Sequence, residues 1–169
     1  SPAPPSDQLT FVEVNFRQGV AGNIHRKQIA FRDVHPAIYG PVSQWGETIA
    51  AHALQGLRER DVELTCEELS IAQIDSPGNA NAAIEMMAVG NANVRGRLYS
   101  ATGERFTYAT EKGMLVLHGS GRSMAKLSFQ QQLGAPRQNA SAETIRFWPK
   151  ERRFEANNGR SIEVSNLRN

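Results

Sequence analysis

The segment ERFTYATEKGMLVLHG, Glu104–Gly119, places apolar side chains at alternate positions on both sides of a Glu-Lys-Gly turn. Phe106 and Tyr108 precede the turn, and Leu115 and Leu117 follow it. A period of two is typical of a β-strand with one buried face, and a glycine-containing turn between two such runs favours a hairpin. We therefore predict two antiparallel strands here, over 105–109 and 114–118.

The same unit recurs along the chain. Shifted by 39 residues, this hairpin falls without a gap on Glu143–Asn158, so that Phe106-x-Tyr108 aligns with Ile145-x-Phe147. Shifted by 37 residues in the other direction, it falls on Glu67-x-Leu69-x-Ile71, followed by a return strand at 84–88. A repeat of this length predicts a stacked β architecture, because each hairpin can bury its apolar face only against its neighbours.

Further short strands are predicted by the same alternation at 11–16, 28–32, 62–73, 94–98, 125–129 and 144–148. Residues 153–156 and 161–164 read as one more hairpin, because Asn157-Asn158-Gly159 suits a type I′ turn. Gly90-Asn91 is predicted to end the strand at 84–89.

Three segments are predicted to lie outside the sheet. Residues 33–61 contain His35-Pro36 and Gly40-Pro41, which argue against a central strand. Residues 48–60 could form a short helix or a long loop; the loop is favoured, with one short helix near 48–58 as the regular element it would contain. Asp75–Asn79 and Gln130–Ser141 read as polar loops. The pattern of short strands favours an all-β sandwich, barrel or open roll. We expect it to form a single domain over 9–169, preceded by a Pro-rich linker at 1–8.

Equivalent repeat positions should face the same way, which defines two ladders of apolar residues. Either they make a closed, dry core or they line a groove. The first ladder is Leu69, Ile71, Phe106, Tyr108, Ile145 and Phe147, and the second is Ile84, Met86, Leu115, Leu117 and Phe154.

Composition excludes several classes of protein. The 169 residues carry 19 basic and 17 acidic side chains, so bulk charge does not predict nucleic-acid binding, and no apolar run approaches the length of a membrane helix. Residues 137–169 hold seven basic groups against four Glu, which is usually solvated surface and less often a site for an anionic partner such as phosphate head groups.

Candidates for catalysis and metal binding are few. One cysteine, Cys66, cannot form an internal disulfide and reads as a buried thiol. His25, His35, His52 and His118 are widely separated and lack the spacing of zinc ligands. We predict no cofactor, no metal, no catalytic residue and no enzymatic activity.

The repeat resembles that of the OstA-like lipopolysaccharide-transport domains (LptA/LptC type). The segment 101–119 is similar to that family's unit of acidic residue, apolar alternation ending in Tyr, turn, and Leu-x-Gly. Residues 142–156 resemble the next unit, and Ala88–Val94 resembles the family's Ala-x-Gly-Asn-Val corner with two extra residues before Val94. Gly22-Asn23-Ile24 resembles an earlier corner. Residues 33–61 match nothing in the family, which indicates a divergent member.

The resemblance implies an antiparallel, open β roll (a β-jellyroll) in the periplasm or cell envelope, with its export signal outside this sequence. It implies an apolar interior that binds lipid A or another acyl lipid, with the two ladders as groove candidates. It also implies pairing of sheet edges with another copy or a related β domain.

Two alternatives stay open. The same roll with a filled interior would be a structural or protein-interaction module that assembles through its edges without lipid. A carbohydrate- or nucleic-acid-binding surface near Trp148 and the basic C-terminal segment is a third reading.

Overall fold

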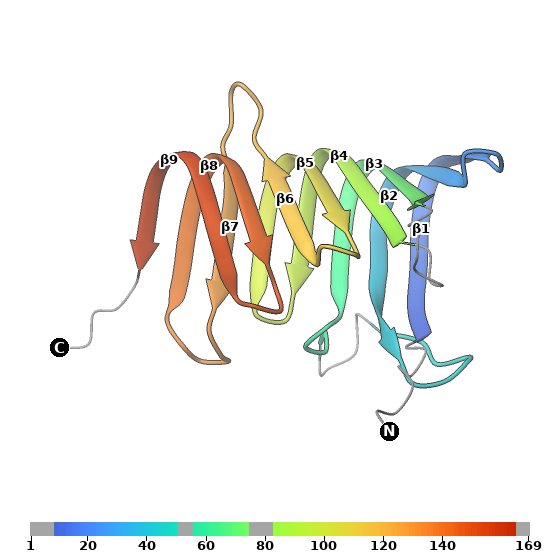
Figure 1. Cartoon of the computed structure of the whole chain (residues 1–169), viewed down its shortest axis with the longest axis horizontal. Helices are drawn as coiled ribbons and strands as arrows, with labels where there is room; N and C mark the ends of the chain where they lie inside the picture. The colour runs from blue at the N-terminus through green and yellow to red at the C-terminus, as the bar shows by residue number, and fades with distance from the viewer. Residues whose placement is uncertain (1–8, 51–55, 75–82, 165–169) are drawn as a thin grey trace.

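The computed structural model describes residues 9–50, 56–74 and 83–164 and contains nine antiparallel β-strands in those ranges (Figure 1). They are β1 (Leu9–Asn23), β2 (Gln28–Val42), β3 (Val62–Ile74), β4 (Ala83–Gly96), β5 (Tyr99–Ala109), β6 (Met114–His118), β7 (Ala125–Gln130), β8 (Arg137–Trp148) and β9 (Arg153–Val164). The prediction of an all-β antiparallel fold is confirmed.

The strands follow one another across a single sheet. β1 to β5 pair in chain order, and β9 pairs with β8. β6 and β7 together fill one strand position, because both pair with β5 on one side and with β8 on the other. The sheet does not close, since β1 and β9 lie at opposite ends of the molecule (Figure 1).

A row of irregularities crosses the sheet and folds it into two layers. Register shifts interrupt the pairing at 34–37 in β2, 89–92 in β4 and 159–161 in β9. Extra residues of this kind bend a strand and increase its twist. Figure 1 shows β8 and β9 arching over one edge of the molecule. At the same edge the 119–124 loop connects β6 to β7, so the chain changes layers there through a loop and not through a bulge. We call the two halves the β6 layer and the β7 layer, after the strand that each contains.

The core lies between these layers. In the β6 layer the register of the strands aligns two rows of apolar residues. Residues that align with each other under the 37- and 39-residue shifts lie in the same row. Aromatic rings join the layers: Tyr99 packs on Phe147 at 5.0 Å between ring centroids, and Phe129 packs on Phe154 at 5.4 Å. The rows are Phe31, Leu69, Ala88, Phe106, Leu117, Ile145, Ala156, and Ile29, Ile71, Met86, Tyr108, Leu115, Phe147, Phe154.

The prolines do not end β2, which corrects one expectation. β2 runs through Pro36 and Pro41 although it lies between β1 and β3. Pro36 follows a cis peptide bond inside the bulge at 34–37, and Pro41 lies beyond Tyr39, the last β2 residue paired with β3. Neither Pro36 nor Pro41 is paired with a β3 residue, so neither interrupts a hydrogen bond between β2 and β3.

Two predicted turns are bulges instead. Gly90-Asn91 does not end β4, and Asn157-Asn158-Gly159 does not form a hairpin, because β9 is one strand paired with β8 on both sides of it. Asn91 and Asn158 both have left-handed φ angles, 44° and 53°. The backbone that a type I′ turn requires is thus used here to bend a continuous strand.

The loop predictions have mixed outcomes. Residues 137–141 belong to β8 rather than to a polar loop, and the turn at 110–113 is present as predicted. No helix occurs in the described part of 48–58, whose residues 51–55 lie outside the described ranges. The predicted linker at 1–8 and loop at 75–79 also lie outside them.

Candidate functional site

A cavity of about 450 Å³ lies between the two layers, within the range of small-molecule sites in proteins. Its walls are the inward-facing side chains of both layers. The β6 layer contributes Leu69, Ile71, Met86, Ala88, Phe106, Tyr108, Leu115 and Phe147, and the β7 layer contributes Ala37, Tyr39, Val62, Leu64, Val94, Tyr99 and Phe129. Alternation within each strand produces this lining, because one face of every strand points inward.

Seven of the eleven groove candidates line this cavity: Leu69, Ile71, Met86, Phe106, Tyr108, Leu115 and Phe147. The other four lie elsewhere. Leu117 and Ile145 are fully buried in the packed core close to the fold line, and Phe154 packs against Phe129. Ile84 lies at the start of β4, where its backbone N–H donates to Thr110 Oγ1 at 3.0 Å.

Three tyrosines, Tyr39, Tyr99 and Tyr108, are among the residues that line the cavity. Tyr39 and Tyr108 lie near each other with ring centroids 6.4 Å apart, one from each layer. Burial raises the pKa of both phenols, and it raises the pKa of Tyr99 as well. All three therefore stay protonated and neutral at physiological pH, so the interior carries hydrogen-bonding groups without charge.

The mouth of the cavity is charged. Glu59, Arg60, Lys150 and Arg152 line it, all exposed, together with turn residues such as Leu98 and Pro149. Three of the four charged side chains are basic, so the mouth is electropositive. Sequence reasoning did not select these residues, because they come from turns that are distant in the chain; the excess of basic residues after position 137 was the available signal for two of them.

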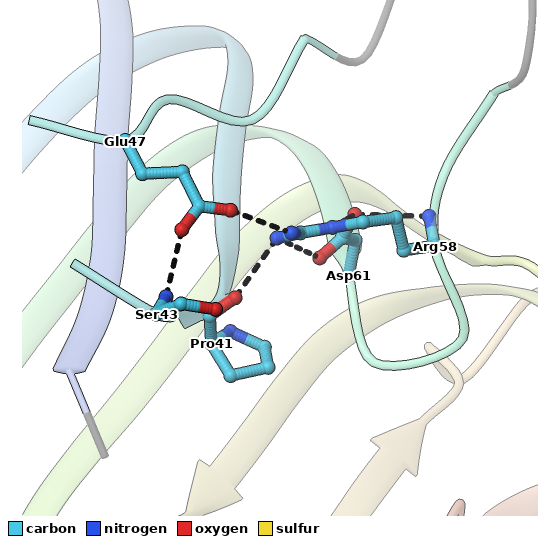
Figure 2. Close-up of polar contacts among 5 residues, drawn as sticks. All are labelled: Pro41, Ser43, Glu47, Arg58 and Asp61. Carbon is cyan, nitrogen blue, oxygen red and sulfur yellow. Dashed lines mark hydrogen bonds and ion pairs between the residues drawn. The ribbon is translucent and has the colours of Figure 1, made fainter. Parts of the chain in front are cut away.

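An ion pair between a buried carboxylate and a half-exposed arginine holds the β2–β3 connection beside this mouth (Figure 2). Arg58 Nε donates to Asp61 Oδ2 at 2.8 Å, and Arg58 Nη2 donates to Asp61 Oδ1 at 3.0 Å and to the Pro41 carbonyl at 2.8 Å. The Asp61 carboxylate has a side chain only 1% exposed, and its hydrogen bonds raise the pKa of Arg58. Gly40 makes room for this pair, because a Cβ there would collide with Asp61 Oδ1 and Ile49 Cδ1.

Glu47 extends the network to the start of the connection. Its Oε1 accepts from Arg58 Nη1 at 3.0 Å, and its Oε2 accepts from the Ser43 backbone N–H at 2.7 Å (Figure 2). The Ser43 bond is the main cause of a lowered pKa for Glu47. Beneath this network Ile49 and Leu57 pack on Ile38. The 56–61 segment at the mouth is therefore anchored by both charge and packing.

The remaining reactive residues do not form a second site. Cys66 is buried, and burial followed by the neighbouring Glu68 and Glu67 raises the pKa of its thiol to about 12, which keeps it protonated. Within residues 9–50, 56–74 and 83–164, no group of three His, Cys, Asp or Glu side chains could hold a metal ion. No helix in those ranges has the length and apolarity to cross a membrane.

No protein-family model matches the sequence, and no curated protein sequence is significantly similar to it. The structure is similar to a crystal structure of LptH from Pseudomonas aeruginosa, which is described as the LptA-homologous periplasmic component of the conserved lipopolysaccharide transport device. The two share 16% sequence identity with a TM-score of 0.59, over 97% of this chain and 100% of that chain. The chain therefore has an LptA-like β-jellyroll fold.

Proposed function

We propose that this chain is a non-enzymatic domain of the cell envelope that binds the acyl chains of a lipid, such as lipid A, between its two layers. The 450 Å³ cavity carries this proposal, because its walls are apolar and uncharged while its mouth is basic. Each buried CH₂ group contributes roughly 0.8 kcal/mol, so about ten of them contribute on the order of 8 kcal/mol before ordering costs. No catalytic group is needed for such binding.

The mouth supports an amphiphile rather than a plain hydrocarbon. Arg60 and Lys150 lie where the polar end of a ligand would meet solvent once its chain lay among Phe106, Tyr108 and their neighbours. Guanidinium and ammonium groups bind phosphate and carboxylate oxygens well. Similarity to the periplasmic LptH supports a periplasmic location and a role related to lipopolysaccharide transport.

Lipid binding is tested by native mass spectrometry of the purified protein and by the shift in thermal midpoint on adding lipid A. We expect co-purifying acyl species and a higher midpoint. Ala88→Phe, which places a ring in the cavity wall, should reduce both effects. Thr107→Phe, on the neighbouring strand and on the opposite face from Phe106, is the control that should bind like the wild type. Absence of both signals in the wild type contradicts the proposal.

A second candidate function is assembly through the sheet edges without lipid. Among the strands that the structure describes, β1 and β9 each pair on one side only and lie at opposite ends of the sheet (Figure 1). β1 exposes Val12, Phe16 and Val20. An edge strand of this kind can accept a strand from another chain.

Proline placed at consecutive positions of β1 tests this candidate. Alternate N–H groups of an edge strand point outward, so one of Val12→Pro and Glu13→Pro removes an outward donor while the other breaks a bond to β2. Assembly predicts that the variant with unchanged stability stays monomeric at concentrations where the wild type sediments as larger species. A wild type that is monomeric throughout contradicts assembly.

A further inference from the structure

The mouth of the cavity is crossed by the side chain of Arg152. Arg152 belongs to the β8–β9 turn at 149–152, which ends the β6 layer. Its Nη1 donates to the carbonyl oxygen of Gln131 at 2.6 Å, and its Nη2 lies 3.4 Å from Glu59 Oε1. Gln131 follows β7, and Glu59 precedes β3 where it enters the β7 layer. One side chain therefore joins the two layers on the side where the roll opens.

The backbone of Arg152 has a conformation that favours glycine. Arg152 has φ 53°, a left-handed conformation that disfavours residues with a Cβ. The 39-residue shift aligns it with Gly113 in the β5–β6 turn, which has nearly the same φ, 56°. The same turn thus occurs twice, once with glycine and once with a strained arginine. The second turn therefore carries a side chain that the first turn lacks.

The two partners are exposed, so their ion pair is weak. The Arg152 and Glu59 side chains are 43% and 71% exposed, so water and salt compete for their ion pair. By contrast, the Asp61 carboxylate that binds Arg58 two residues further along is 1% exposed. Glu59 is therefore carried on a firmly anchored segment, and the breakable contact is the one across the mouth.

We propose that Arg152 is a strap across the cavity mouth, which closes the two layers over a bound chain and releases to let it pass. Entry then occurs between the β8–β9 turn and the 56–61 segment. This inference rests on the proposed lipid-binding function and adds the route of entry and the residue that controls it. Arg60 and Lys150 flank the same opening and would meet the polar end of the entering ligand.

The test measures how fast a ligand enters and leaves. Stopped-flow fluorescence with cis-parinaric acid, a fluorescent fatty acid, is applied to the wild type, Arg152→Gly and Glu59→Gln. Glycine suits the left-handed turn, as Gly113 does, so Arg152→Gly removes the strap without straining the backbone. Lys112→Ala removes one positive charge from the equivalent β5–β6 turn and is the matched control.

We expect association and dissociation rates to rise together in Arg152→Gly, by roughly two- to tenfold, the factor set by an exposed ion pair and one hydrogen bond. Glu59→Gln should give a smaller rise in both rates, because the bond to Gln131 remains. Added salt screens the attraction of the fatty-acid carboxylate to Arg60 and Lys150 in both proteins, so association with the wild type should rise with salt relative to association with Arg152→Gly. Lys112→Ala should behave like the wild type.

The failure of the strap and the failure of the proposed lipid binding give different results. If all four proteins bind cis-parinaric acid with the same rates and the same salt response, the strap is overturned while lipid binding stands. If Arg152→Gly slows association, the arginine attracts the ligand rather than closing the mouth, and the strap is again overturned. If none of the proteins binds the fatty acid, the proposed function fails and the entry route fails with it.

Discussion

Asp61 is a charged side chain held in the protein interior by a single arginine. Its two carboxylate oxygens accept from the Arg58 guanidinium, and Oδ2 also accepts from the Arg58 backbone N–H at 2.9 Å. A buried carboxylate that loses its partner keeps the full cost of leaving water. The pair is therefore more consequential for the β2–β3 connection than the exposed ion pairs elsewhere on the surface.

Removing the guanidinium should expose that cost. We expect Arg58→Met to lower the free energy of unfolding by about 2–4 kcal/mol, measured by urea denaturation. The double variant Arg58→Met/Asp61→Asn should recover part of the loss, because a neutral amide oxygen can still accept the backbone N–H. A double variant less stable than Arg58→Met would show that the carboxylate is not the source of the cost.

His118 makes stability depend on pH in a predictable direction. Burial, then Arg105 and Arg146, lowers its pKa below the ordinary 6.5. The unfolded chain therefore binds a proton at a pH where the folded chain does not, so stability rises with pH across that interval. The stability is fully present above pH 6.5 and is lost as the pH falls from there toward the lowered pKa.

We expect the urea midpoint of the wild type to fall between pH 7.5 and about 5.5, and His118→Gln to reduce that fall. The difference between the two proteins isolates His118 from other titrating groups. A steeper fall in His118→Gln would reverse the sign assigned here.

At the scale of strands, the bulges decide the architecture. Asn91 Nδ2 donates to Glu67 Oε1 at 2.7 Å, and Asn158 Nδ2 donates to Glu143 Oε2 at 2.7 Å. Both asparagines are left-handed, and each bonds the glutamate that opens a repeat unit. The glutamate thus marks the fold line on one strand, and the asparagine bends the strand beside it. The third unit has Gly119 at this position, where the loop to β7 begins.

Substitution of these asparagines separates their two roles. We expect Asn91→Ala to reduce stability by about 1–3 kcal/mol, because it loses the bond to Glu67 and keeps a strained φ. Asn91→Gly loses the same bond but relieves the strain, so it should cost clearly less. The pair Asn158→Ala and Asn158→Gly should repeat this order in thermal unfolding. Equal costs for Ala and Gly would show that the backbone conformation contributes little.

Alternation made most strands predictable, whereas their continuity was not. A buried face is indicated by local alternation alone, as at Phe106 and Tyr108 or at Leu115 and Leu117. Asn158-Gly159 does not indicate whether the chain reverses in a turn or only bends at a bulge, because the turn and the bulge use the same left-handed backbone. Pro36 led to a wrong prediction of a strand end for a related reason. It lies in a bulge, where the hydrogen bond that proline cannot make is not required. Arg137–Ser141 lacks large apolar residues, and its one buried residue is Ala140, so the sequence shows no apolar alternation there.

At the scale of the whole molecule, the cavity occupies the part of the interior away from the fold line. Near the fold line alanines and larger aliphatic residues pack tightly, with Val34, Leu117, Ala125, Ala142 and Ile145 at 0% exposure. The layers separate toward their turns, where larger residues line open space. The phase of the repeat predicted which residues face inward. It could not predict where packing stops or which turns meet at the mouth, since those depend on contacts between distant segments.

Two leucines on one strand test this division of the interior. Leu115 and Leu117 face inward two residues apart on β6, but only Leu115 lines the cavity. Leu117→Ala creates a new void in a packed region and should cost about 3–5 kcal/mol. Leu115→Ala enlarges space that already exists, so it should cost less, about 2–3 kcal/mol, because fewer contacts are lost. Urea unfolding measures both costs. Since each variant removes the same atoms, equal values would mean that the interior beside Leu115 is packed in solution, and the space proposed for an acyl chain would be absent.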